Sequence, residues 1–482
     1  MRKISDLSRR ELLKLFGISV GATILDPAAW PRQVQAQSKK VTPRKSARNV
    51  IYIQNCGAMS QHETLDFKET KYTAHDLDIQ KVNSDFSISK MIFPNYEKWA
   101  PRASLVRSMW ENSLVHFTGQ YHSQAGRAFN PAITREIPAL GSLIASELEH
   151  ERRDSDTFPT FMSVDLWNAR CPSIGSGMLH PRFAGLDLNT SSVFDSFAGA
   201  DGGPQSSADL TRRWEVLNRI SEVSDAGKAP IGGKADEYTA HYQYAFKILM
   251  DPRFKKVLSV TDEEKKRYGA DKDKGTCNLG LSMLLARNIL AADAGARFLW
   301  IANSYNGNNG PADNHDQIYG RGALAPKGFV MSIYESGPRL DAALGSLVQD
   351  LSAMPGKQPG KTMLDETMIV LGHEFGRNPD FNSNLGRDHW GAVYTDMFIG
   401  GGVKPGRVIG KTDGYKSLDH GWSHKEQPMK DHTTSTIYSA LGIDYSKKIV
   451  DTPSGRAYEY QQTAPLGGPA FIPLAEIAEL FI

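Results

Sequence analysis

The chain has 482 residues, 56 Lys and Arg against 54 Asp and Glu, and a formal net charge of +2. This balance lacks the basic excess that nucleic-acid binding requires, so we expect no nucleic-acid partner. Beyond the N-terminus, no apolar run approaches the roughly 20 residues that span a bilayer. The length suits one large α/β domain or two smaller ones.

The first 36 residues predict an export signal. The segment "SRRELLK" matches the twin-arginine consensus, "LFGISVGATIL" has the length of a signal-peptide core, and "VQA" offers a cleavage site. Removing residues 1–36 takes away six basic and three acidic residues, which changes the formal charge from +2 to −1. We expect residues 37–482 in the periplasm or at the cell surface, exported by the twin-arginine translocase and without a transmembrane segment.

Short apolar runs alternate with helical patterns along the rest of the chain. The runs that predict strands are residues 49–54, 103–109, 160–164, 297–302, 367–372 and 395–400. Helical periodicity marks residues 138–151, 282–295, 334–354 and 433–442, and Gly295 is a candidate helix stop. Strands that alternate with helices and are apolar on both faces predict an α/β fold with a largely parallel sheet.

Residues 195–275 differ from their surroundings. Stretches rich in Gly, Ser, Ala and Asp flank a helical pattern there, which predicts a helical insertion with flexible links. The three cysteines, Cys56, Cys171 and Cys277, are far apart and form no CxxC motif. We therefore expect buried thiols and no thiolate zinc site.

Acidic and imidazole side chains follow four of the predicted strands. Glu63 and Asp66 follow the first strand, His116 and His122 the second, and Asp313 and His315 the strand at 297–302; "HEFGR" and "GRDHWG" follow 367–372. Parallel strands bring their carboxyl ends to one edge, so these side chains should converge. Mixed imidazole and carboxylate ligation without cysteine suits one or two divalent ions such as zinc or manganese.

Arg377 and Arg387 lie within the same segment. A guanidinium fork binds tetrahedral oxyanions through two hydrogen bonds. A divalent metal and an arginine side by side can stabilise the negative charge that develops during phosphoryl or sulfuryl transfer. The alternative is that the arginines form ion pairs with Asp380 or Asp388.

The motifs "NVIYIQNCGAMSQHETLDFK", "LDETMIVLGHEFGRNP", "GRDHWGAVYTDMFIGGG" and "DHTTSTIYSALGID" resemble the family of domains of unknown function numbered 1501. This family resembles the alkaline phosphatase and sulfatase superfamily. The resemblance implies an alkaline-phosphatase-like three-layer sandwich with a largely parallel central sheet. It extends over about residues 45–450.

The resemblance also implies a set of metal ligands. The "EFGR" and "GRDHW" elements are intact, and "ADNH" keeps the acid and imidazole of the family's Trp-Asp-Thr-His pattern. The loop "GAMSQHETLD" departs from the family, with Gln61 for a histidine and Glu63 for the first aspartate. The implied ligands are Glu63, Asp66, Asp313, His315, Glu374, Asp388 and His389.

The residue at the reacting position departs from the superfamily pattern. Superfamily enzymes place a serine or threonine after the second strand, where this chain has His116. His116 is a candidate base, nucleophile or metal ligand, and Thr118 or Ser123 is a candidate hydroxyl. Attack by water, or a site that has lost catalysis, are the alternatives.

The function that these features predict is an exported, metal-dependent hydrolase of phosphate or sulfate esters. Its substrate would be a small-molecule or glycan ester, with Arg377 and Arg387 on the oxyanion and His116 or Thr118 at the reacting position. One alternative is a non-catalytic extracytoplasmic binding module on a degenerate scaffold. Another is a transferase that moves a phosphorylated group onto an envelope glycan.

Overall fold

The computed structural model describes most of the chain. The described residues are 34–36, 41–169, 172–173, 175–196, 208–209, 211–216, 219, 245–272, 278–304, 310–326, 328, 330–464 and 471–482. Of the predicted export signal only residues 34–36 are among them, and they form β1 (Val34–Ala36), antiparallel to β16 (Lys447–Ile449). Cys171, Cys277 and much of the predicted insertion lie outside the described residues.

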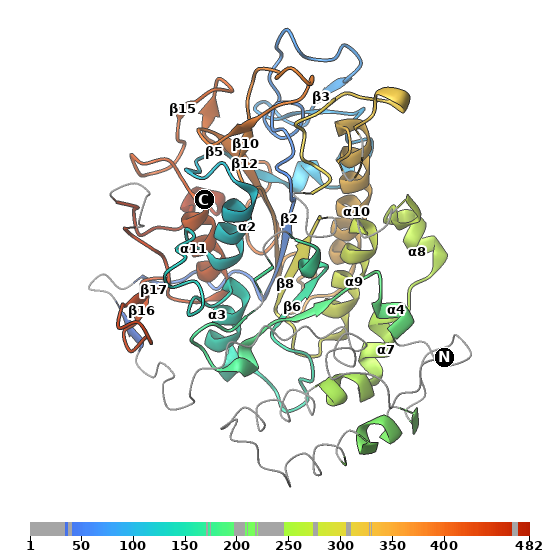
Figure 1. Cartoon of the computed structure of the whole chain (residues 1–482), viewed down its shortest axis with the longest axis vertical. Helices are drawn as coiled ribbons and strands as arrows, with labels where there is room; N and C mark the ends of the chain where they lie inside the picture. Colours follow the sequence, from blue (N-terminus) through green and yellow to red (C-terminus); the bar gives the residue numbers. More distant parts are fainter. Residues whose placement is uncertain are drawn as a thin grey trace.

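An eight-stranded sheet forms the centre of the molecule (Figure 1), in the order β13-β5-β12-β9-β2-β8-β6-β7. Only β12 runs antiparallel to its neighbours, so the sheet is largely parallel, as predicted. The six predicted strands are all present, with ends within one residue of those expected. The strands are β2 (Asn49–Gln54), β5 (Ser104–Met109), β6 (Phe161–Val164), β7 (Leu186–Leu188), β8 (Phe298–Ala302), β9 (Thr367–Gly372), β12 (Tyr394–Ile399) and β13 (Val408–Ile409).

The two faces of the sheet bury two separate cores. Successive side chains of a strand point to opposite faces: Ile51 and Ile53 of β2 lie in one core, and Val50 and Tyr52 lie in the other. Helices α9 and α10 cover the first face, and α2, α3 and α11 cover the second (Figure 1). The fold is therefore the three-layer α/β sandwich that the family resemblance implies, with the largely parallel sheet that the strand pattern predicts. The covering helices are α2 (His116–Ala125), α3 (Leu140–Glu147), α9 (Leu279–Ala292), α10 (Ile333–Ala353) and α11 (Lys430–Leu441).

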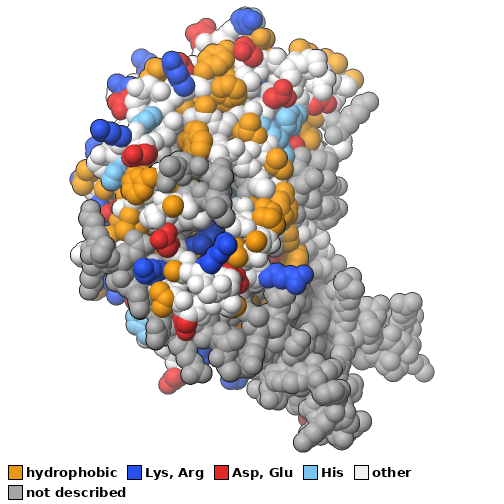
Figure 2. Space-filling model, turned by 60° about the vertical axis from the view of Figure 1, so that its left-hand side comes forward, with side chains coloured by type: hydrophobic (Ala, Val, Ile, Leu, Met, Phe, Trp, Pro, Cys, Tyr) orange, Lys and Arg blue, Asp and Glu red, His pale blue; other side chains and the backbone are white. Residues whose placement is uncertain are grey.

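Shorter elements complete the described part of the chain. They are α4 (Val193–Ser196), α7 (Pro252–Leu258), α8 (Asp262–Arg267), β3 (Ile79–Lys81), β4 (Ser87–Ser89), β10 (Gly376–Arg377), β11 (His389–Trp390), β14 (Lys411–Thr412), β15 (Ser417–Asp419) and β17 (Tyr458–Glu459). None of the helices in the described ranges is long and apolar enough to cross a membrane. On the face in Figure 2, hydrophobic, basic and acidic side chains are interspersed.

Two local features differ from the sequence analysis. Helix α2 was not predicted, because its side chains "HFTGQYHSQA" are mostly polar and yet buried, so no apolar stripe marks it. The predicted helix stop at Gly295 is wrong. Helix α9 ends at Ala292, and Asp293 takes the left-handed conformation with φ 44°. Aspartate is one of the few residues that adopts this conformation readily.

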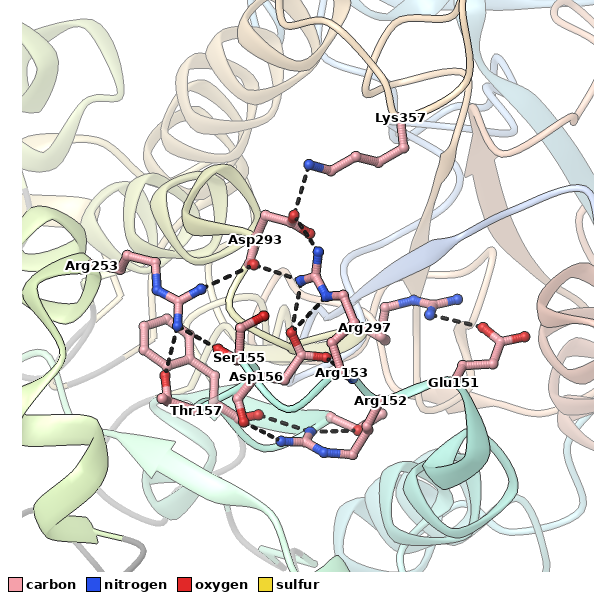
Figure 3. Close-up of polar contacts among 12 residues, drawn as sticks. Glu151, Arg152, Arg153, Ser155, Asp156, Thr157, Arg253, Asp293, Arg297 and Lys357 are labelled. Carbon is pink, nitrogen blue, oxygen red and sulfur yellow. Dashed lines mark hydrogen bonds and ion pairs between the residues drawn. The ribbon is translucent and has the colours of Figure 1, made fainter.

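Asp293 gathers basic side chains from separate parts of the chain (Figure 3). Its carboxylate lies 2.9 Å from Arg153 Nη1, 3.2 Å from Arg48 Nη2 and 2.7 Å from Lys357 Nζ. Its backbone carbonyl accepts hydrogen bonds from Arg153 and Arg253. The end of α9 is thereby tied to the segments before β2, β6 and β9.

We predict that D293A lowers the free energy of unfolding by about 2 kcal/mol, because it removes charged hydrogen bonds and strains a left-handed position. D293N should cost less, since asparagine tolerates that conformation. Urea unfolding followed by circular dichroism measures both. The exposed D154A is the matched control and should change stability by less than about 0.5 kcal/mol; equal effects of D293A and D154A would contradict the role of the network.

Candidate metal centre

Four side chains from three separate loops meet beyond the carboxyl ends of β5, β8 and β9. They are His116 at the start of α2, Asp313 and His315 in the segment after β8, and His389 of β11. One ligand atom from each lies within 4.8 Å of all the others. His116 and Asp313 are buried, while His315 and His389 are partly exposed. The group thus has a buried floor and an open side.

The local backbone explains why these residues approach one another. The β10–β11 hairpin pairs Arg377 with His389 and folds the second half of the "GHEFGRNPDFNSNLGRDHWG" segment back over the end of β9. Gly57 has φ +95°, and a Cβ at this position would lie 2.4 Å from the Asp313 nitrogen. Glycine at position 57 therefore allows the loop after β2 to pass against Asp313.

The Nε2 atoms of the three histidines face inward. Those of His315 and His389 are 2.6 Å apart. The Nε2 atom of His116 lies 3.4 Å from Asp313 Oδ2, is buried and has no hydrogen-bond partner. A buried imidazole nitrogen without a partner is costly unless something binds it. A divalent cation among these atoms would satisfy all three nitrogens and the carboxylate together.

The outward Nδ1 atoms are each held by an acceptor. Their partners are the Glu374 carboxylate for His116, the Asp388 carboxylate at 3.1 Å for His315 and the Leu114 carbonyl at 2.6 Å for His389. Histidines that bind a metal through one nitrogen almost always donate the other N–H to a carboxylate or carbonyl. Phe375 packs against the rings of His116 and His389, with centroids 5.0 Å and 4.2 Å away. The residues present therefore fit a divalent metal ion.

The electrostatics favour the protonation states that bind a metal. Burial and the nearby charge of Arg377 lower the pKa of His389 to about 3, and the same two causes lower the pKa of His315. Burial would raise the pKa of Asp313, but His116 and Arg377 outweigh burial and lower it well below its usual range. Neutral imidazoles and an ionised carboxylate are the forms that coordinate cations.

His116 is the exception in this group. Burial would lower its pKa, but the carboxylates of Glu374 and Asp313 outweigh burial and raise it. Without a cation, a proton on His116 would balance those two negative charges. A metal ion and this proton therefore compete for the same nitrogen.

Two of the implied ligands, Glu374 and Asp388, lie behind histidines instead of inside the four-residue group. Glu374 is fully buried, and its Oε1 accepts hydrogen bonds from Gly57 N at 2.9 Å and from Gln120 Nε2 at 2.7 Å. Helix α2 approaches Glu374 so closely that a Cβ on Gly119 would lie 3.0 Å from its Cβ. In this position Glu374 orients the His116 ring.

The remaining predicted residues form ion pairs in the interior. Arg377 lies 2.5 Å from Asp313, and Arg387 lies 2.6 Å from Glu63; both arginines are fully buried. The alternative pairing of these arginines with Asp380 or Asp388 is wrong, because Asp313 and Glu63 are their partners. Asp66 is bound by two bases, Lys68 at 2.6 Å and Arg107 at 3.1 Å.

The candidate hydroxyls lie farther along α2. Thr118 Oγ1 donates to the Val115 carbonyl at 3.0 Å and contacts the Ser113 hydroxyl. Ser123 is buried and donates to the Gly119 carbonyl at 3.3 Å. Thr118 is two residues from His116 at the N-terminal end of the helix, and it is only partly buried.

A second set of charged side chains adjoins the four-residue group through Glu374. The sequence analysis did not identify these side chains as a unit. The two ring nitrogens of His122, on α2, donate to the carboxylates of Glu111 at 2.9 Å and Asp431 at 3.0 Å. Lys430 lies 3.2 Å from Glu111 and donates to the Glu374 backbone carbonyl. All four charged side chains are buried and they join α2, α11 and the segment after β9. No periodicity in the sequence marks this arrangement.

Fold and site together define a three-layer α/β protein with a His and Asp cluster at the carboxyl edge of its sheet that could hold a metal ion. The chain belongs to the family described as "Protein of unknown function (DUF1501)", whose model matches residues 47–465. This confirms the family resemblance. No curated protein matches the chain.

The chain is also similar to solved structures, over most of its length but at low sequence identity. A lipoteichoic acid synthase from Listeria monocytogenes has 9% identity and a TM-score of 0.37, with 95% of this chain and 81% of that chain covered. A protein in the alkaline phosphatase superfamily from Vibrio parahaemolyticus has 10% identity and a TM-score of 0.34, with 93% and 78% covered. A sulfatase from Pseudoalteromonas sp. has 13% identity and a TM-score of 0.36, with 82% and 68% covered.

We predict that H389A lowers the affinity for Zn²⁺ or Mn²⁺ by at least about 100-fold, and that E374Q lowers it by about 10–100-fold through loss of the partner of His116. Competition with a fluorescent chelator measures both affinities. H150A, on an exposed histidine, is the matched control and should leave the affinity unchanged. An H389A protein with unchanged affinity would show that the ion binds elsewhere.

A separate prediction concerns pH. Burial lowers the pKa of His122, but Glu111 and Asp431 outweigh burial and raise it from 6.5 to about 9. Between these values the folded chain keeps a proton that the unfolded chain releases, so stability should fall as pH rises, by up to about 1.4 kcal/mol per pH unit. Urea unfolding across this range measures the slope. It should flatten in H122N and persist in H150N, and a flat wild-type profile would contradict the ion pairs.

Proposed function

We propose that this protein is an exported, metal-dependent hydrolase of phosphate or sulfate esters. The observation that carries the proposal is the convergence of three imidazole Nε2 atoms and the Asp313 carboxylate at an open edge of the sheet, with each outer nitrogen held by an acceptor. Structural metal sites are closed, whereas catalytic sites keep an open side. Here the partial exposure of His315 and His389 supplies that open side.

His116, Asp313, His315 and His389 would hold the ion. Three imidazoles and one carboxylate suit zinc or manganese better than magnesium or calcium, which prefer oxygen ligands. When bound, such an ion polarises an ester oxygen and lowers the pKa of water. The chain's own contribution is to orient the rings through Glu374, Asp388 and the Leu114 carbonyl.

The N-terminus of α2 is suited to bind the oxyanion of the ester. Its first intrahelical hydrogen bond runs from Gly119 N to Val115 O, so the amides of residues 116–118 precede it. Val115 is exposed and has no polar side chain to cap them. The amides at a helix N-terminus attract anions. We assign the oxyanion to these amides, because the guanidinium groups of Arg377 and Arg387 are buried and bound to carboxylates.

Thr118 is our candidate for the attacking hydroxyl. It belongs to the same helix terminus, it is only partly buried, and its hydroxyl contacts that of Ser113. The twin-arginine consensus at residues 8–14 supports export of the folded chain. Export after folding would allow the metal to be inserted in the cytoplasm, and we propose the periplasm or cell surface as the final location.

The test is turnover of aryl phosphates and aryl sulfates by the full chain with added Zn²⁺ or Mn²⁺. We expect activity that a chelator abolishes, and we expect T118A to lower kcat by at least about 100-fold with unchanged metal content. T362A, at a partly exposed threonine in the turn before β9, is the matched control and should leave kcat unchanged. A loss of turnover in S123A but not in T118A would identify Ser123 as the attacking hydroxyl. A metal-loaded chain without turnover would contradict hydrolysis and favour a binding module.

A further inference from the structure

The acidic side chains near the metal group are already neutralised by bases. Glu63 is bound by Arg387, and Asp66 is bound by Lys68 and Arg107. The Arg387 guanidinium also donates to the Asn378 carbonyl at 3.0 Å, which anchors it away from the four-residue group. Both carboxylates of the loop after β2 are therefore paired with a base, although Glu63 Oε2 makes no hydrogen bond of its own.

Asp313 differs because it faces two ways. One carboxylate oxygen, Oδ2, lies 3.4 Å from the unpartnered Nε2 atom of His116. The other, Oδ1, lies 2.5 Å from Arg377 Nη2. The imidazoles of the four-residue group thus lie on the Oδ2 side of the carboxylate, and the permanent positive charge of Arg377 lies on the Oδ1 side.

Arg377 itself is enclosed by oxygen atoms. Its Nε donates to the Ala58 carbonyl at 2.9 Å, its Nη1 to the Arg387 carbonyl at 2.9 Å, and its Nη2 to the Gly57 carbonyl and to Asp313. The side chain is fully buried. Carbonyl and carboxylate oxygens are the atom types that hard divalent cations bind. Here the guanidinium binds these oxygens, and arginine stays protonated in proteins.

We propose that the metal centre holds a single divalent ion and that the Arg377 guanidinium occupies the position of a second cation. The proposal rests on the metal binding of the proposed function and adds the number of ions and the role of Arg377. Arg377 is a positioning residue: it holds Asp313 so that Oδ2 faces the three imidazoles, and it repels any ion from the adjacent oxygen atoms.

This arrangement has a consequence for the reaction. In two-metal sites one ion serves the attacking oxygen and the other serves the leaving oxygen. With one ion and a buried arginine, no second ion stabilises the other of these two oxygens. Protein groups such as the amides at the N-terminus of α2 must then supply the second half of the charge stabilisation.

The first measurement counts ions in the full chain. The protein is saturated with Mn²⁺ by equilibrium dialysis, and bound manganese is measured against protein by elemental analysis and by electron paramagnetic resonance. We expect one ion per chain with the six-line signal of isolated Mn²⁺. Two ions per chain with a spin-coupled signal would overturn this inference but leave the proposed function standing. Binding of no ion by the folded chain would overturn the proposed function and this inference with it.

The second measurement removes the guanidinium. In R377A the four oxygen atoms lose their cation, so we expect uptake to rise from one to two Mn²⁺ per chain with a spin-coupled signal. R377K keeps the charge and should stay at one ion. R297A removes a partly buried arginine that binds Glu151 and the Arg48 carbonyl, and as the matched control it should also stay at one ion. A folded R377A protein that still binds one ion would overturn the role of Arg377. If R377A does not fold, the wild-type count alone decides.

Discussion

The carboxylate of Asp313 is the interaction on which the rest of this site depends. It is a buried negative charge, and burial of an unpaired charge is strongly unfavourable. The chain meets this constraint with Arg377 on one oxygen and the inward nitrogens of His116 and His315 near the carboxylate. Gly57 allows the loop after β2 to pass against the Asp313 backbone. Two of the three imidazoles of the group, His116 and His315, thus lie against this one carboxylate.

The sheet makes this convergence possible. Asp313, His389 and His116 come from segments that follow β8, β9 and β5, and those strands all run in the same direction. Their carboxyl ends therefore open at one edge, where loops can carry polar groups while the strands stay buried on both faces. Two apolar cores, one on each face, hold the strands rigidly enough to align loops that are distant in the sequence.

Beneath the site the interior is polar as well as apolar. Glu374 orients His116, and its backbone carbonyl accepts from Lys430, which in turn pairs with Glu111 beside His122. A buried network that is nearly satisfied defines one geometry, because every alternative leaves a charge unpaired. This network explains why α2 and α11 pack closely although both are rich in polar residues. It also makes Glu374 part of the support of the site.

The sequence by itself determined the sheet and the general place of the site. All six expected strands form, since continuous apolar runs are buried on both faces of a covered sheet. His116, Asp313, His315 and His389, which follow three of these strands, meet at one edge. The sequence did not reveal α2, because its polar residues are buried by pairing with distant partners that no periodicity records. Motif "EFGR" likewise gave no means of deciding whether Glu374 binds a metal or orients a histidine.

Only the tertiary structure decided how the converging residues are divided. His116, Asp313, His315 and His389 form the group that could hold a metal ion, whereas Arg377 and Arg387 form ion pairs with Asp313 and Glu63 inside the protein. The physical reason is that local sequence specifies which groups reach an edge of the sheet. The partner that each charge takes there depends on distances of a few ångströms, which are set by packing across the whole domain.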